Sequence, residues 1–294
     1  MRMFITVAIN FFLLASALAQ QVTYVTTLQP FRFILEEIAG SRARVHALLP
    51  PGASPHTHQP RPSDVRAVEQ AAALLMGGRG LDDWARELPC RRLVTLIDLL
   101  PEDSLLHIAP HGKAEMSGSD HAHVHAGVDP HFWTDPLLVR ALVPVLVDSL
   151  CRIDPPGCQQ YRANAAAFAQ SLDSLTVAIA TSLKGARGAR VVLAHPFFNY
   201  FLRRFGIEVV GTVEVAAGSE PSPRDLQRLL ATFRAKGVEA IFTHPQLPDR
   251  AARVLAEAAG VPVYQLDPLG GGEGKATYEQ LLWYNARILA KVLQ

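Results

Sequence analysis

The feature that constrains this chain most is a repeated alternation of short apolar runs with amphipathic stretches, interrupted once in the middle. In the first part, strands are expected at residues 22–28, 45–49 and 73–76, and helices at 31–39 and 63–70. In the last part, strands are expected at 190–194, 207–213, 238–243 and 261–266, with helices at 197–205, 223–236, 247–259 and 277–293. Strands that alternate with helices are typical of a parallel sheet covered by helices. The sequence therefore predicts an α/β fold.

The interruption divides the chain into two lobes. Residues 101–127 have no hydrophobic period and are rich in Asp, Ser, Gly and His, which is typical of a mobile, solvated loop. A helix is expected at 136–153, a break at Asp154-Pro155-Pro156-Gly157, and a long Ala-rich helix from 159 to about 183. We expect an N-terminal lobe over 20–157 with a histidine-rich loop at 107–127, a rigid linking helix over 158–185, and a C-terminal lobe over 186–294.

The composition excludes several classes of protein. Of 294 residues, 49% are hydrophobic and 19% are charged, which is typical of a globular protein and not of a disordered one. The formal net charge is only +1, so the chain lacks the positive charge that DNA, RNA or an anionic membrane would attract. We expect no nucleic-acid partner.

The first 19 residues indicate export. Met1-Arg2-Met3 provides a basic start, residues 4–18 are almost wholly apolar, and Ala17-Leu18-Ala19 places small residues where a signal peptidase cleaves. A membrane anchor, the alternative, needs about twenty apolar residues, and this run is shorter. We expect a signal peptide that is cleaved near Ala19, and the absence of a Cys directly after the run argues against a lipid anchor.

An exported protein meets an oxidising environment, in which cysteines pair. Of the three cysteines, Cys151 and Cys158 flank the turn at residues 152–157, whereas Cys90 is distant in the chain. We expect a Cys151–Cys158 disulfide and a free, buried Cys90. Three pairings remain possible from the sequence alone, as does a chain with three unpaired thiols.

Four potential metal ligands lie where strands are predicted to end or helices to begin. His56 is in a Pro/Gly-rich loop after the strand at 45–49, and His131 comes between the flexible loop and a helix start. His195 and Asp267 directly follow the strands at 190–194 and 261–266. In open α/β sheets, ligands bind in the crevice beyond the carboxyl ends of the strands. We therefore expect the four side chains to point into one crevice.

Three imidazoles and one carboxylate form a suitable tetrahedral set for Zn²⁺. A proline stands beside each of the four, at Pro55, Pro130, Pro196 and Pro268, and limits the freedom of the backbone that carries the ligand. Each residue alone is equally consistent with an ordinary core residue or a turn, so the prediction depends on their joint placement.

Five segments, in this order, carry a resemblance to a known family: "LLPPGASPHTHQPRPSD", "DPHFWTDP", "LAHPFFNYFLRRFG", "EPSPRDL" and "LDPLGG". Together the chain resembles the metal-specific solute-binding proteins of bacterial ABC importers, cluster A-I, and in particular the zinc-uptake branch. The resemblance runs from about Val22 to the C-terminus. It implies two α/β lobes joined by a long helix, one metal ion in the cleft, a periplasmic location, a membrane permease as partner and no enzymatic activity. We also expect a monomer.

The resemblance places the ligand positions of the family on His56, His131, His195 and Asp267. In the manganese branch the third position is commonly a glutamate, so His195 favours zinc, which accepts nitrogen ligands more readily than the harder Mn²⁺.

Three features depart from the family pattern: His58, His244 and a missing disulfide. His58 stands where an aromatic is common and could compete with or supplement His56, while His244 replaces a frequent glutamate and is expected at the rim with a structural role. Glu220 is expected to cap the following helix region or to face solvent. A second-lobe disulfide, often present in zinc-branch members, cannot form, because no Cys follows Cys158.

The loop before His131 predicts a second, weaker metal site formed by His111, His121, His123 and His125. His107 and Asp120 lie in the same stretch, and zinc-branch members often carry such a loop. A flexible histidine cluster can raise the local concentration of zinc, but it must lose conformational entropy on binding. The alternative is a solvated loop whose histidines have no role in binding.

The expected function is high-affinity capture of Zn²⁺ and its delivery to an ABC-type permease. One alternative is a manganese- or iron-binding importer component. Another is a secreted zinc-dependent hydrolase, but four protein ligands would fill the position that a catalytic zinc keeps for water, and the sequence has no H-E-x-x-H motif. A metal buffer or adhesin without a transporter would share the same site and stays open.

Overall fold

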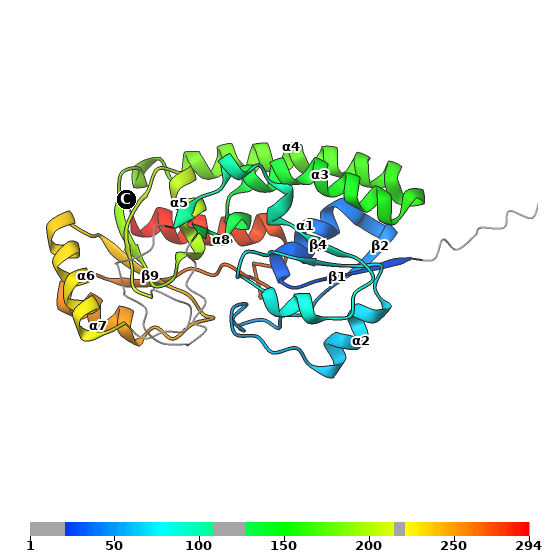
Figure 1. The fold of residues 1–294 in the computed structure, drawn as a ribbon. Coiled ribbons are helices and arrows are strands. Elements are labelled where there is room, and N and C mark those ends of the chain that lie inside the picture. Colours follow the sequence, from blue (N-terminus) through cyan, green and yellow to red (C-terminus); the bar gives the residue numbers. More distant parts are fainter. Residues whose placement is uncertain (1–20, 109–126, 215–220, 294) are drawn as a thin grey trace, which may run out of the picture.

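The computed structural model describes residues 21–108, 127–214 and 221–293. Within them, two four-stranded sheets are flanked by helices (Figure 1). The expected signal peptide, the loop histidines His111, His121, His123 and His125, and Glu220 lie outside the described residues.

The first sheet is parallel, with strand order β2-β1-β3-β4. Its strands are β1 (Val22–Thr26), β2 (Ala43–Ala47), β3 (Ala73–Met76) and β4 (Leu93–Thr95). Successive side chains of a strand point to opposite faces. Tyr24 and Leu75 therefore join the main core, whereas Val25 and Leu74 pack with Val68 on the outer face. Helix α1 (Gln29–Ala39) covers the face of the sheet toward the main core, and α2 (Pro62–Gln70) covers the outer face.

The second sheet repeats this arrangement with strand order β10-β9-β7-β8, again parallel. Its strands are β7 (Arg190–Leu193), β8 (Glu208–Thr212), β9 (Ala240–Thr243) and β10 (Val263–Gln265). Leu193 and Phe242 face the main core, and Val192 and Ile241 face the outer layer. The outer layer contains α6 (Pro223–Lys236) and α7 (Arg250–Ala259), and the inner face meets α5 (Asn199–Arg204) and α8 (Tyr278–Val292).

Two long helices connect the sheets, α3 (Pro136–Ile153) and α4 (Cys158–Ser182). They run side by side along one side of both sheets (Figure 1). The buried residues of α4 recur at intervals of three and four: Tyr161, Ala165, Phe168, Leu172, Leu175 and Ile179. Such a stripe keeps one face of the helix on the core along its whole length of about 37 Å. Because α4 contacts both α1 and α8, one continuous core holds the two sheets together.

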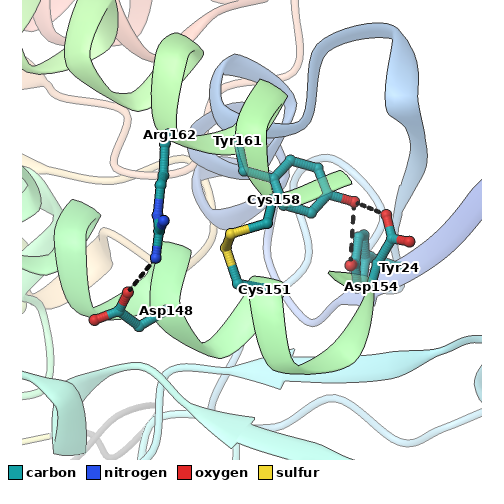
Figure 2. The surroundings of a disulfide bond; sticks show 7 residues. All are labelled: Tyr24, Asp148, Cys151, Asp154, Cys158, Tyr161 and Arg162. Carbon is teal, nitrogen blue, oxygen red and sulfur yellow. Dashed lines mark hydrogen bonds and ion pairs between the residues drawn. A yellow bond between two sulfur atoms is a disulfide. The ribbon is translucent and has the colours of Figure 1, made fainter. Parts of the chain in front are cut away.

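A disulfide and a polar cluster close the turn between α3 and α4, as Figure 2 shows. Cys151 is joined to Cys158, which confirms the expected pairing. The hydroxyl of Tyr161 donates to Asp154 at 2.6 Å, and Arg42 donates two further hydrogen bonds to the same carboxylate. The turn that the sequence marks with two prolines is thereby fixed to the first sheet.

The α/β fold with two helix-flanked parallel sheets is confirmed, and several local expectations are wrong. Strand β4 was not expected, and residues 101–108 are not wholly irregular, because β5 (His107–Ile108) pairs antiparallel with β6 (Gly127–Val128). Strand β2 begins two residues earlier than expected, since it pairs with β1 from Val22 onward. Cys90 is free, but it is only half-buried. The exact limits of the lobes stay a prediction.

No helix in the described part of the chain combines the length and apolarity needed to cross a bilayer.

Candidate metal centre

His195 is placed by the end of a buried strand. Strand β7 ends at Leu193, and two residues later His195 has an extended backbone (φ −140°, ψ 150°) before Pro196 begins a 3₁₀ turn. Its side chain is 1% exposed. The carboxylate of Glu214 lies 3.7 Å from Nδ1 of this imidazole, so Nε2 is the nitrogen that faces away from Glu214.

His131 is held by a neighbouring carboxylate. Its imidazole is fully buried, and its Nδ1 lies 2.7 Å from Oδ1 of Asp129, which also accepts from the backbone N–H of His131. Oδ2 of Asp129 accepts from Asn199, and the hydroxyl of Tyr200 donates to the Asp129 carbonyl. A carboxylate at Nδ1 fixes the proton there and leaves Nε2 with a lone pair for a metal.

His56 comes from the loop between β2 and α2. Its Nδ1 lies 3.4 Å from the carbonyl oxygen of Gly80, and the indole of Trp84 donates to the carbonyl of Pro55 at 2.8 Å. A cavity of about 390 Å³ adjoins His56, His58 and Trp84. His56 is half-buried, in contrast to the other two imidazoles.

The three Nε2 atoms converge. Nε2 of His56 lies 3.4 Å from Nε2 of His131 and 3.1 Å from Nε2 of His195. One ligand nitrogen from each of the three lies within 4.8 Å of the others. An oxygen lies near each Nδ1, at 2.7 Å for His131, 3.4 Å for His56 and 3.7 Å for His195, and the tautomers protonated at Nδ1 direct the three Nε2 lone pairs toward one another. Three lone pairs facing a common point repel unless a cation or a shared proton lies between them.

Asp267 follows β10, as expected, but it does not belong to this set of mutually close ligand atoms. Its Oδ1 accepts from Gln246 and from the backbone N–H groups of Leu269 and Gly270, and its Oδ2 accepts from Lys275 at 2.5 Å. Burial alone would raise the pKa of Asp267, but these hydrogen bonds outweigh it and hold the pKa below its ordinary value. The carboxylate is therefore ionised and bound to an ammonium group.

Asp129, Glu214 and Lys275 surround the candidate ligands and were missed in the sequence. Asp129 begins the "DPHFWTDP" segment, and a carboxylate two residues before a histidine can accept a hydrogen bond from that histidine's backbone N–H, as it does here. Glu214 follows strand β8 and lies at the same sheet edge as His195, so the strand-end rule could have found it. No sequence pattern predicts the contact of Lys275 with Asp267, because it depends on the path of the glycine-rich turn between them.

The two histidines that depart from the family pattern have separate surroundings. The His58 ring packs edge-on against Trp84, with Nε2 3.7 Å from a carboxylate oxygen of Asp64. His244 is buried and not at the rim, so its expected position is wrong. Its two ring nitrogens lie 3.0 and 3.1 Å from the carbonyl oxygens of His195 and Leu266, so the residue after β9 is tied to the backbone of His195 and to the residue before Asp267. Burial lowers the pKa of His244 to about 4.

Comparison with known proteins identifies the family. A family profile described as zinc-uptake complex component A, periplasmic, matches residues 25–292. The chain belongs to this family. The zinc-uptake component A family comprises periplasmic solute-binding proteins of ABC importers that bind metal ions, and this agrees with the resemblance seen in the sequence.

Similar proteins are named for two different metals, manganese and zinc. The chain is 28% identical to the manganese-binding lipoprotein MntA of Halalkalibacterium halodurans, over 86% of this chain and 82% of that protein. It is 26% identical to the high-affinity zinc uptake system protein ZnuA of Yersinia pestis, over 90% and 86%. A crystal structure of a ZnuA deletion mutant with zinc bound matches with a TM-score of 0.76 and 26% identity, over 93% of this chain and 98% of that one.

Proposed function

We propose that this protein captures Zn²⁺ in the periplasm, with the imidazoles of His56, His131 and His195 and the carboxylate of Asp267 as ligands, and delivers it to the permease of an ABC importer. The observation that carries the proposal is the convergence of three Nε2 atoms from three separate segments of the chain. Membership of the zinc-uptake family supports the transport role.

The nitrogen separations are close to those of three ligands bound to one metal ion. With Zn–N bonds of 2.0–2.1 Å, tetrahedral ligands lie about 3.3–3.4 Å from one another. Two of the Nε2 pairs are 3.1 and 3.4 Å apart. A zinc ion therefore needs only small side-chain shifts, and the buried partners of Nδ1 limit the entropy lost on binding.

The donor set favours zinc over manganese. Three imidazole nitrogens suit Zn²⁺, whereas Mn²⁺ prefers carboxylate, carbonyl and water oxygens. A relative that is named for manganese keeps manganese as the second candidate. Asp267 is the only oxygen donor among the four proposed ligands, so the use of its carboxylate decides how well Mn²⁺ competes.

Capture without turnover agrees with the family and with the proposed set of four ligands. A catalytic zinc keeps one coordination position for water beside a general base. Here the fourth position is assigned to Asp267. We propose that the protein acts as a monomer without a nucleic-acid partner, after export and cleavage near Ala19, and that the loop histidines His111, His121, His123 and His125 bind zinc weakly.

Metal competition tests this function. The purified apoprotein is titrated with Zn²⁺, Mn²⁺ and Fe²⁺ against a chelator of known affinity. One tight Zn²⁺ per chain is expected, bound more strongly than Mn²⁺ or Fe²⁺. His46→Ala provides a control, because His46 is exposed on strand β2 and should leave the affinity unchanged. The proposal would be refuted if His56→Ala, His131→Ala and His195→Ala each bound Zn²⁺ as tightly as the wild type and the His46→Ala control do.

A further inference from the structure

The carboxylate that is proposed as the fourth ligand already forms an ion pair with a lysine. The ammonium of Lys275 lies 2.5 Å from Oδ2 of Asp267, in a hydrogen-bonded ion pair. The other oxygen, Oδ1, already accepts three hydrogen bonds, from Gln246, Leu269 and Gly270. Oδ2 is therefore the oxygen that a metal ion would use, and a positive charge is already bound to it.

Lys275 is held in place from two directions. Its ammonium lies 4.7 Å from the centre of the Tyr284 ring, on helix α8, and its side chain is only 19% exposed. Its backbone closes a tight turn, because Gly271 N–H donates to the Lys275 carbonyl and Lys275 N–H donates to the carbonyl of Gly272. Gly270 has a φ of +70°, and a Cβ there would lie 2.9 Å from the Lys275 carbonyl oxygen. The turn thus positions Lys275 and the amides that bind Asp267 as one unit.

We infer that Lys275 is a specificity-determining residue, which competes with the incoming cation for Asp267 and so selects against metals that depend on a carboxylate ligand. This inference rests on the proposed function and names the residue that sets its metal preference. A cation that coordinates Oδ2 must displace the ammonium or share the oxygen with it, and two positive charges at one oxygen repel. The competition weakens every metal that uses Asp267.

The penalty differs between metals because they use the four ligands unequally. Zn²⁺ obtains most of its binding energy from the three imidazoles, with water able to complete its coordination. Mn²⁺ gains less from imidazole nitrogens and more from a carboxylate oxygen. A lysine on Asp267 therefore costs Mn²⁺ more than Zn²⁺. Specificity of this kind arises from an element that disfavours the competitor.

The experiment measures the dissociation constants of Zn²⁺ and Mn²⁺ for the full chain, by chelator competition, in the wild type and in variants of the ion pair. Lys275→Gln should raise the Mn²⁺ affinity about tenfold, because the metal no longer has to displace a charge-assisted hydrogen bond from Asp267, and should raise the Zn²⁺ affinity by less. Lys275→Arg keeps the charge and should keep the wild-type ratio. Lys236→Gln is the control, because Lys236 is half exposed and 4.0 Å from Glu208 on the outer side of the second sheet.

A second set of variants shows whether Lys275 acts through Asp267. In the wild-type background, Asp267→Asn should weaken Mn²⁺ more than Zn²⁺, and this result does not depend on how a Lys275 variant folds. In the double variant, Lys275→Gln should not raise the Mn²⁺ affinity above that of Asp267→Asn alone. A general structural change would instead lower the melting temperature and alter both affinities in the same proportion.

An unchanged or increased preference for Zn²⁺ in Lys275→Gln would overturn the inference, and so would a Mn²⁺ gain that persists without the Asp267 carboxylate. The proposed function is judged separately, on the wild-type protein in the same titration. If the wild type binds no Zn²⁺ tightly, the proposed function fails. If the wild type binds Zn²⁺ tightly but the ratio of Zn²⁺ to Mn²⁺ affinity is the same in Lys275→Gln, only the role of Lys275 is refuted.

Discussion

Replacing Asp129 by asparagine tests the claim that a buried carboxylate prepares His131 for a metal. The Asp129 carboxylate lies 2.7 Å from Nδ1 of His131, and both groups are fully buried. The charged acceptor fixes the proton on Nδ1 and makes Nε2 a better donor to a cation. An asparagine can still accept through its amide oxygen, but it has no charge and can turn its NH₂ group toward the imidazole.

The expected loss is a 10–100-fold weaker Zn²⁺ affinity, which is the range seen when the carboxylate partner of a ligating histidine is replaced. At about 1.4 kcal/mol per tenfold change, this corresponds to about 1.4–2.8 kcal/mol of binding free energy. The fold should persist, because Tyr200 donates to the backbone carbonyl of residue 129, which the substitution leaves in place.

The assay is chelator competition at fixed pH and ionic strength, together with the melting temperature of the apoprotein. Asn199→Ala is the matched control: Asn199 donates to the other oxygen of Asp129, and its loss leaves the contact with His131 intact. It should weaken Zn²⁺ less than Asp129→Asn does. An Asp129→Asn protein that is folded and binds Zn²⁺ as tightly as the wild type would refute the reasoning.

Three further predictions concern the ligand, the loop and the acid stability. His195→Ala should weaken Zn²⁺ binding by about 100-fold or more while circular dichroism stays native, since losing a ligand exceeds the loss of its partner; equal affinity would remove His195 from the set. Replacing residues 109–126 by Asn-Gly, a two-residue connection between the paired residues Ile108 and Gly127, should keep one tight Zn²⁺ and lose weaker binding, as equilibrium dialysis would show. The hydrogen bonds from Arg42 are the main cause that lowers the pKa of Asp154, so this carboxylate stabilises the fold fully above its ordinary pKa of 3.8 and loses that effect as the pH falls below it. Urea unfolding from pH 6 to pH 3 should therefore show a smaller acid loss in Asp154→Asn, and an identical pH dependence would contradict the assignment.

The sequence predicted the fold class because each sheet is built from consecutive strand–helix units whose hydrophobic pattern is local. It missed β4, which has only three residues, one of them exposed and two half-buried. It also missed the hairpin of β5 and β6, whose two-residue strands are too short for any period to show. Strand ends shifted by a few residues, because they are set by pairing with neighbouring strands, as for β2 against β1.

The positions of the candidate ligands could be predicted where they follow the end of a strand. His195 follows a buried strand, and the carboxyl edge of a parallel sheet brings it to the crevice together with His56 and His131. What the sequence did not reveal is how these imidazoles are held: the Asn199 contact to Asp129 spans 70 residues, and the Lys275 contact to Asp267 depends on the exact path of a glycine-rich turn. Such partners follow from tertiary packing and leave no local pattern.

Zinc K-edge X-ray absorption on the protein loaded with one equivalent of Zn²⁺ tests the central claim most directly. Three imidazoles at about 2.0–2.1 Å, with the multiple-scattering features of histidine rings and one or two oxygen donors completing the shell, are the predicted result. The imidazole signal should fall to two rings in His195→Ala. A first shell that contains sulfur, or one with fewer than three imidazoles in the wild type, would contradict the account.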